Sequence, residues 1–204
     1  DKELPRYPFA QGKSVLVSEM GWANHQTGVS ENLQAAYAIR LRLLSLALAH
    51  QSAHTANPHL GLWWYDWQND GQDPQDIEHH YGLTLHTGAA KAALNALNEL
   101  ETVMPVHGSP HPSRTAQIGS VGALTAMRVD TQAQGPSPQH PTLLAIWHPA
   151  NEQATLTTQL QEDTPRFSGS CQAQKTAPRK WQITVGAMPC WIQLSKPTGL
   201  EAFL

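Results

Sequence analysis

Two strand signals, each followed by a helix signal, fill the first half of the chain and constrain its fold more than any other feature. Short apolar runs at 14–18 and 60–65 predict buried strands. A helical pattern follows each run: the first opens with Ser30 as N-cap and ends by Pro58, and the second covers about 88–101. Strand, helix, strand, helix is the repeat of a parallel α/β sheet. A complete barrel has eight such units, so this region is expected to be the last quarter of something larger.

Both predicted helices carry an apolar stripe that is expected to pack against the sheet. Arg40 and Arg42 lie on the first helix and are expected to be exposed or to bridge to acidic residues. The stripe of the first helix is Leu33, Tyr37, Leu41, Leu44 and Leu48, and that of the second is Ala90, Ala93, Leu94, Leu97 and Leu100.

Beyond Pro105 the composition changes. A linker or turn region is expected at 105–120, followed by short β-like runs separated by Gly, Pro, Asn and Ser, which is typical of a β-sandwich. The proline-rich stretch at 132–141 is expected to be a surface loop. The β-like runs are 124–129, 143–147, 154–160, 181–185 and 191–194.

Charge and cysteine content exclude several classes of function. Charged residues make up 14% of the chain, the net charge is -3, and the basic residues are scattered, so no nucleic-acid partner is expected. No stretch is apolar for long enough to span a bilayer, since Arg40 and Arg42 interrupt the best candidate. Cys171 and Cys190 could form a disulfide or remain two buried thiols, and they are too few for a cysteine-type metal site.

The carboxylate best placed for chemistry is Glu19, at the end of the first predicted strand. In a barrel of parallel strands that position is the C-terminal rim, where catalytic groups lie. A glutamate fixed there can attack an anomeric carbon and hold a covalent glycosyl intermediate. Gly21 would let the backbone approach the sugar, and Trp22 would offer it a flat apolar face. The structural alternative is that Glu19 caps the strand end or pairs with an arginine.

Aromatic side chains crowd the end of the second predicted strand, which reads Trp-Trp-Tyr-Asp-Trp-Gln-Asn at 63–69. Sugars present C–H patches that stack on aromatic rings, and Asp or Asn side chains hydrogen-bond to hydroxyl groups. Because side chains alternate along a strand, Trp63 and Trp64 point to opposite faces, and at least one tryptophan is expected to be core. The expected sugar contacts are stacking by Trp22, Tyr65 and Trp67 and hydrogen bonding by Asp66 and Asn69.

The polar loop at 68–87 does not predict a metal site. The acidic residues between 70 and 78 miss the alternate spacing of an EF-hand loop. The adjacent histidines at 79–80 do not converge on one helix face as a zinc-binding pair would. Glu78 is expected to anchor the loop or to touch a substrate.

Taken together, the motifs resemble the end of a clan A glycoside-hydrolase barrel, most like family 39 and with family 5 relatives also similar. The resemblance covers about 13–103 and implies the last two β/α units of a TIM barrel, followed by a small β-sandwich-like domain. It also implies a retaining mechanism with Glu19 as nucleophile and no cofactor. The matching segments are Val-Ser-Glu-Met-Gly-Trp at 17–22, Gln-Ala-Ala-Tyr at 34–37, Trp-Tyr-Asp-Trp-Gln-Asn-Asp-Gly at 64–71, Glu-His-His-Tyr-Gly-Leu at 78–83 and Lys-Ala-Ala at 91–93.

This resemblance divides the chain into the C-terminal part of a (β/α)8 glycosidase barrel at 1–104, a linker at 105–120 and a β-rich accessory domain at 121–204. It also implies a general acid/base that the chain lacks, a glutamate following asparagine at the end of the fourth strand. Retaining hydrolysis needs two carboxyl groups about 5–5.5 Å apart, so Glu19 cannot catalyse it alone. The expected function is hydrolysis of O-glycosidic bonds in a poly- or oligosaccharide, by an enzyme of which this chain is a fragment. The expected partners are the carbohydrate and the missing N-terminal part of the barrel.

Two other classes of function stay open. The missing acid/base, together with Trp147, Trp181 and Trp191, favours a non-catalytic carbohydrate-binding or scaffold module, unless these tryptophans fill a core. Alternatively, the half-barrel folds only by pairing with its missing part or with another copy, because a parallel sheet edge is normally covered. A polysaccharide substrate and a disulfide would favour a secreted or periplasmic protein.

Overall fold

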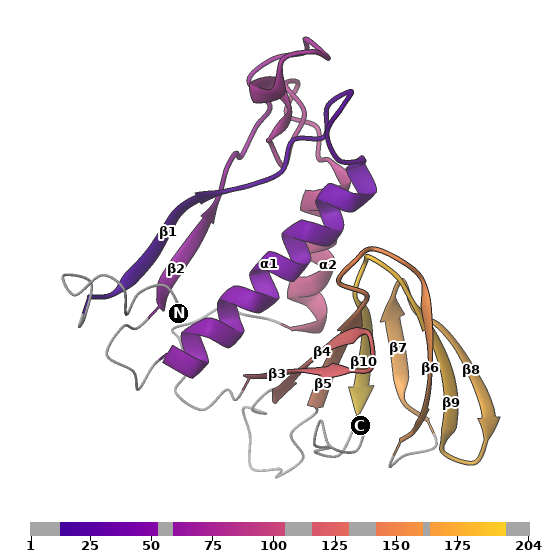
Figure 1. Cartoon of the computed structure of the whole chain (residues 1–204). Helices are drawn as coiled ribbons and strands as arrows, with labels where there is room; N and C mark the ends of the chain where they lie inside the picture. Colours follow the sequence, from indigo (N-terminus) through magenta and orange to yellow (C-terminus); the bar gives the residue numbers. More distant parts are fainter. Residues whose placement is uncertain (1–12, 53–58, 105–115, 131–141, 161–163, 195–204) are drawn as a thin grey trace.

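A computed structural model of the chain describes residues 13–52, 59–104, 116–130, 142–160 and 164–194, arranged in layers (Figure 1). Two helices lie between a two-stranded sheet on one side and two larger sheets on the other. A short 3-10 helix, η3 (Ile77–His80), lies in the loop between β2 and α2. The first layers consist of β1 (Val15–Met20), β2 (His59–Trp64), α1 (Glu31–Ser52) and α2 (Ala92–Val103). None of the described helices is both long and apolar enough to span a lipid bilayer.

Antiparallel strands form the two larger sheets. The five-stranded sheet has the order β3 (Ala116–Val121), β4 (Leu124–Asp130), β5 (Thr142–Trp147), β10 (Cys190–Leu194) and β7 (Arg166–Gly169). The three-stranded sheet has the order β6 (Ala154–Gln159), β9 (Lys180–Val185) and β8 (Gln172–Ala177). The chain is therefore a sheet-rich molecule with two helices, in which all five predicted β-like runs are strands.

Strands β1 and β2 pair in parallel, as the alternation of strand and helix predicted. The prediction that β1 is buried is wrong: Leu16 is 47% exposed and Met20 39% exposed. Within the described residues no other strand pairs with these two, so the sheet is too narrow to bury its own side chains. Helix α1 begins as predicted, with the backbone N–H of Leu33 donating to Ser30 Oγ at 3.2 Å.

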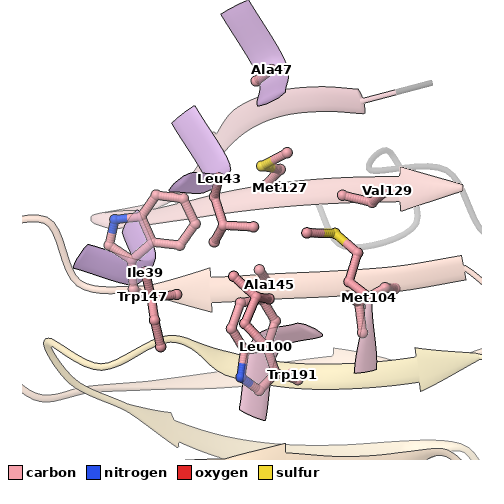
Figure 2. Close-up of a cluster of buried hydrophobic side chains, with 11 residues drawn as sticks. Ile39, Leu43, Ala47, Leu100, Met104, Met127, Val129, Ala145, Trp147 and Trp191 are labelled. Carbon is pink, nitrogen blue, oxygen red and sulfur yellow. The ribbon is translucent and has the colours of Figure 1, made fainter. Parts of the chain in front are cut away.

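The face that α1 buries only partly matches the predicted stripe, of which Leu41 is buried. Ile39 and Leu43 point into a core that the two helices share with the five-stranded sheet, whereas Leu44 and Leu48 of the predicted stripe are 37% and 43% exposed (Figure 2). The helix is apolar on several sides, so the spacing of apolar residues alone does not predict which face is buried. The sheet that the helix contacts determines that face. The core comprises Ile39, Leu43, Ala47, Leu100, Met104, Met127, Val129, Leu143, Ala145, Trp147 and Trp191.

Arg40 joins α1 to the β strands and is buried, which corrects the prediction that it is exposed or bridges to an acid. Its guanidinium donates to the backbone oxygens of His148, at 2.9 Å, and Ala187, at 2.7 Å from Nε, and to Asn151 Oδ1 at 2.9 Å. Burial lowers the pKa of Arg40, and the nearby Tyr37 opposes that effect. Arg42 behaves as predicted by bridging to an acid: it is partly exposed, with Nη2 3.9 Å from Glu101 Oε1.

A second core lies between the five-stranded and three-stranded sheets. It is built from residues such as Leu144, Ile146, Ile183 and Ile192, and it is closed by the Cys171–Cys190 disulfide. The disulfide resolves the alternative that the sequence left open. The core comprises Leu124, Ala126, Leu144, Ile146, Leu160, Ile183, Val185, Cys190, Ile192 and Leu194.

Three strands escaped sequence-based prediction, and all three lie at sheet edges. β3 begins at Ala116, inside the stretch predicted as a linker, while β7 and β8 are short or polar. Edge strands bury little surface, so they lack the apolar runs by which strands are found. The division at 104 and 120 remains a prediction, and the proline-rich stretch at 132–141 lies outside the described residues.

Removing the buried guanidinium of Arg40 should weaken the attachment of the helices to the β strands and so lower the free energy of unfolding. We expect Arg40→Met to lower the free energy of unfolding by about 3 kcal/mol, because it leaves the Ala187 carbonyl without a donor and removes one of the two donors to the buried His148 carbonyl. The control Arg42→Met, two residues along the same helix, should cost less than about 1 kcal/mol because its ion pair is long and partly exposed. Urea unfolding followed by tryptophan fluorescence measures both, and equal effects would contradict the role assigned to Arg40.

Candidate active site

The loops that follow β1 and β2 lie together at one end of the molecule, beyond the carboxyl ends of the two parallel strands (Figure 1). The strands remain in contact there, because the N–H of Tyr65 donates to the Met20 oxygen at 3.0 Å. A Cβ at residue 21 would collide with the Tyr65 carbonyl oxygen. Gly21 is therefore needed for the close approach of the neighbouring chain segment, and the approach of a sugar that the sequence suggested stays a prediction.

Glu19 lies within β1, one residue before the strand ends, and its side chain is exposed. Among the described residues, no side chain or backbone group donates a hydrogen bond to its carboxylate, and no arginine pairs with it. The structural alternatives considered for Glu19, a capping contact or an arginine pair, are thus not seen in the described part of the chain. An exposed carboxylate at the carboxyl end of a parallel strand is free to meet a ligand.

The aromatic residues separate into a buried and an exposed set. Trp22 and Trp64 pack together, with ring centroids 5.9 Å apart, and Trp22 also lies 4.8 Å from the ring of Tyr37. Trp64 donates from Nε1 to the Tyr81 oxygen at 3.0 Å and contacts the core beside the helices. The sequence predicted at least one core tryptophan without saying which, and Trp64 is the one of this strand that is partly buried against that core. Trp63 and Trp67, by contrast, are 58% and 62% exposed.

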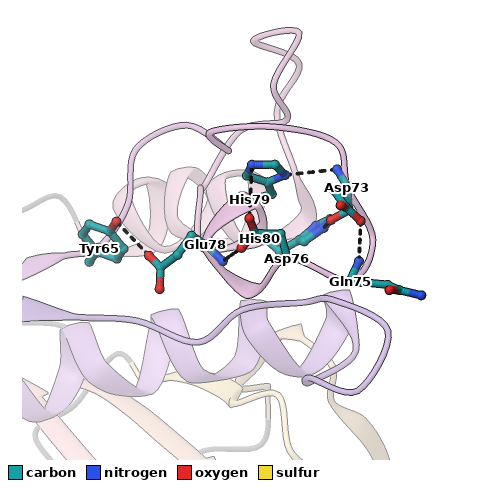
Figure 3. A network of polar contacts seen from close by, with 7 residues as sticks. All are labelled: Tyr65, Asp73, Gln75, Asp76, Glu78, His79 and His80. Atoms are coloured by element: carbon teal, nitrogen blue, oxygen red, sulfur yellow. Dashed lines mark hydrogen bonds and ion pairs between the residues drawn. The ribbon is translucent and has the colours of Figure 1, made fainter.

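Tyr65 is held by the loop that carries η3 (Figure 3). Its hydroxyl donates to Glu78 Oε2 at 3.2 Å, and this hydrogen bond is the main cause of a raised pKa of Tyr65. Its ring meets that of Tyr81 edge-on, with centroids 5.3 Å apart. Glu78 thus anchors the loop, one of the two roles expected for it. The peptide bond from Tyr65 to Asp66 is cis, and Asp66 Oδ1 accepts a hydrogen bond from the N–H of Trp67.

The acidic and histidine side chains of this loop bond within it. Asp76 caps η3 by accepting from the N–H of Glu78 at 3.0 Å, and Asp73 accepts from the N–H of Gln75 at 2.9 Å (Figure 3). The N–H of Asp73 in turn donates to His79 Nδ1 at 3.1 Å. Within the described residues, no three His, Cys, Asp or Glu side chains are grouped so as to hold a metal ion.

Two buried polar side chains that lie in the matching motifs, but for which the sequence indicated no role of their own, hold the loops in place. Gln34 of α1 donates from Nε2 to the oxygens of Trp22, at 2.7 Å, and His80, at 3.2 Å. Lys91, only 1% exposed, donates from Nζ to Asn24 Oδ1 at 2.7 Å, to Asn69 Oδ1 at 3.2 Å and to the His80 oxygen at 3.2 Å. Both residues therefore tie the loop after β1 to the loop after β2.

These contacts alter the roles predicted for two residues. Asn69, expected to contact sugar hydroxyls, turns its Oδ1 to a buried lysine and is itself 5% exposed. Trp22, expected to stack on sugar, is half-buried against Tyr37 and Trp64. A lysine at the start of a helix is ordinarily solvated, so Lys91 gave no signal in the sequence beyond its place in the Lys-Ala-Ala motif.

Burial of Lys91 should make stability depend on pH. Desolvation lowers the pKa of Lys91 to about 8, although the negative charge of Glu31 partly opposes this effect by raising it. In the unfolded chain a lysine has a pKa of about 10.4. Between these values the unfolded chain binds a proton that the folded chain does not, so the free energy of unfolding rises with pH across this window.

We expect that rise to be on the order of 3 kcal/mol for the native chain and to be absent in Lys91→Met. Chemical unfolding at pH 7, 9 and 10.5 measures it. Lys180→Met, at an exposed position of β9, is the control and should follow the native chain. If the free energy of unfolding depended on pH in the same way for the native chain and for Lys91→Met, Lys91 would not be the buried charge that causes the rise.

Comparison with known proteins supports the fold. No protein-family model and no curated protein match the chain. A solved structure described as a family 39 glycoside hydrolase from the gut symbiont Bacteroides cellulosilyticus WH2 is similar, with a TM-score of 0.62 and 21% sequence identity. The match covers 88% of this chain and 33% of that one, so the chain spans about a third of the length of that enzyme. The similarity confirms the resemblance seen in the sequence: this chain shares its fold with part of a family 39 glycoside hydrolase.

Proposed function

We propose that this chain is the part of a retaining glycoside hydrolase that carries the nucleophile, Glu19, and part of the sugar-stacking surface. Its substrate would be an O-glycosidic bond of a poly- or oligosaccharide. The observation that carries the proposal is an exposed, unpaired carboxylate near the carboxyl end of β1, beside a strand that carries the exposed Trp63 near its end and is followed by the exposed Trp67. In this proposal β1 and β2 are neighbouring strands of a TIM barrel, and the two larger sheets form a β-sandwich-like accessory domain.

The chemistry requires one further carboxyl group. Glu19 attacks the anomeric carbon while a general acid protonates the leaving oxygen, so that the glycosidic C–O bond breaks and a glycosyl ester forms. The same group, now a base, removes a proton from the water that hydrolyses the ester. The two carboxyl groups must stand about 5–5.5 Å apart. Two thirds of the similar enzyme has no counterpart in this chain, and we propose that the acid/base belongs to that part of the barrel.

Exposure revises the set of residues proposed to bind sugar. Trp63 and Trp67 offer the most accessible aromatic surface, and Tyr65 lies between them with its hydroxyl fixed by Glu78. Stacking on such rings is favourable because sugar C–H groups meet the negative ring face. Asp66 retains one carboxylate oxygen beyond the contact with Trp67 and is kept as a hydroxyl-binding residue.

A non-catalytic carbohydrate-binding module is the second candidate function. The exposed Trp63 and Trp67 suit it as well as they suit a catalytic cleft. Trp147 and Trp191 no longer support it, because both are buried in the core beneath the helices, and Trp181 packs against Phe167 with ring centroids 4.9 Å apart. Binding by this candidate would therefore occur at the loops after β1 and β2, and not on the larger sheets.

The nucleophile can be tested in the full-length protein that contains this chain. We expect Glu19→Gln to lower kcat by about 1000-fold or more, because the covalent intermediate cannot form. With Glu19→Ala, added azide should restore turnover of an activated glycoside and give a glycosyl azide inverted at the anomeric carbon, since azide attacks from the vacated face. Glu99→Gln, an exposed carboxylate on α2, is the matched control and should leave kcat unchanged.

Normal turnover by Glu19→Gln would refute the assignment of the nucleophile. If the full-length protein hydrolyses no glycan, while this chain is retarded in gels that contain polysaccharide and Trp63→Ala or Trp67→Ala abolishes the retardation, the binding module replaces the enzyme as the function.

A further inference from the structure

A pocket of about 250 Å³ opens where the loops after β1 and β2 meet the turn before α2. Asn24 reaches it from the loop after β1, and the other lining residues come from the loop between β2 and α2, so the packing of two distant loops creates it. None of the residues that line it is acidic, although the chain as a whole has a net charge of -3. The lining residues are Asn24, Asn69, Gly71, Gln72, His80, Leu85, His86 and Thr87.

The buried lysine orients two of these lining side chains. An ammonium group can only donate, so the hydrogen bonds from Lys91 Nζ fix the Oδ1 atoms of Asn24 and Asn69 toward the lysine. The Nδ2 groups of both asparagines then point to the other side. Neither has a hydrogen-bond partner among the described residues. Two amide donors thus remain available to whatever enters the pocket.

His86 lies at the exposed rim, and its imidazole adds an N–H donor to the pocket. His80 adds none at Nε2. This nitrogen lies 2.7 Å from the Asp73 carbonyl oxygen, which can only accept, so its N–H is already bonded.

The charge of Lys91 is not neutralised by direct contact. Its three described partners are neutral oxygens. The carboxylate of Glu31, which acts on it from a greater distance, accepts the N–H of Ala92 at 2.8 Å and so caps α2. A buried cation whose contacts are all neutral favours an anion nearby, because the field is weakly screened away from water.

We propose that this pocket binds an oxyanion carried by a glycan, either the carboxylate of a uronic acid or a sulfate ester. The two Asn Nδ2 groups would donate to its oxygens, and Lys91 would stabilise its charge through the amides. The identity of the ligand as a glycan rests on the proposed function, whereas the preference for an anion rests on the pocket itself. The site would select acidic over neutral sugars.

Titration of the 204-residue chain by NMR tests this directly, with the side-chain amide resonances of Asn24 and Asn69 as reporters. We expect glucuronate or glucose 6-sulfate to shift these resonances saturably, and glucose to leave them unmoved. A response to glucuronate alone assigns the carboxylate, and a response to the sulfate ester alone assigns the sulfate. Inorganic sulfate binding as tightly as either sugar would overturn recognition of a glycan and leave an adventitious ion only.

Isosteric variants provide a second test of the proposed anion site. Asn24→Asp and Asn69→Asp keep a partner for Lys91 but replace the free donor with an acceptor oxygen, and each should weaken anion binding at least tenfold. Asn151→Asp is the matched control, since Asn151 also accepts from a buried cation, Arg40, and undergoes the same change of charge. It should leave the affinity unchanged. Equal binding of glucose and glucuronate, or unaltered affinity in both Asn24→Asp and Asn69→Asp, would overturn the proposal.

These measurements need no turnover, so they are independent of Glu19. Anion binding with no loss of activity in Glu19→Gln would remove the nucleophile and keep the subsite. A large loss of activity in Glu19→Gln without anion binding would keep the enzyme and remove the subsite.

Discussion

A guanidinium buried beneath helix α1 is the contact on which the rest of the structure depends. Arg40 holds the backbone of two turns of the β sheets, and six residues earlier on the same helix Gln34 holds the backbone of the loops beyond β1 and β2. Both side chains donate to main-chain oxygens, so they fix the path of the chain and not merely the position of another side chain. Helix α1 therefore sets the distance between the core of the sheets and the candidate site.

The strongly apolar parts of the fold were predictable from sequence, and the weakly apolar parts were not. Strands such as β5 and β10 contain continuous apolar runs because both of their faces are covered. Edge strands such as β8, Gln-Ala-Gln-Lys-Thr-Ala, bury one side at most and resemble surface loops in sequence. The buried face of α1 was only partly predicted for a related reason. A helix that is apolar on several sides has more than one apolar stripe, and the neighbouring sheet determines which stripe is buried.

The candidate site divides in the same way. Glu19 and Trp67 could be proposed as site residues from the sequence, because a carboxylate and aromatic rings at the ends of parallel strands have a recognisable chemical purpose. The burial of Lys91 could not be predicted, because nothing in a sequence distinguishes a lysine whose side chain is buried from one whose side chain is exposed to solvent. Its burial turned Asn69 from an expected sugar ligand into a lysine partner, and its side-chain oxygen and nitrogen now face different surroundings. The burial of Lys91, which the sequence did not predict, thus gives Asn69 a structural role that the motif did not indicate.

The Cys171–Cys190 disulfide has a consequence for the durability of the chain. It joins two cysteines that are 19 positions apart in the sequence, and the segment between them contains β8, β9 and the turn that connects these strands. Arg179 in that turn and Lys180 at the start of β9 are exposed basic residues of the kind after which trypsin-like proteases cleave. A cut at that turn severs the backbone yet leaves both pieces covalently joined, with β9 and β10 still held in the core between the sheets. Such a nicked molecule would migrate as intact protein until a reductant divides it. The crosslink therefore protects the continuity of the molecule against a cut at this exposed turn.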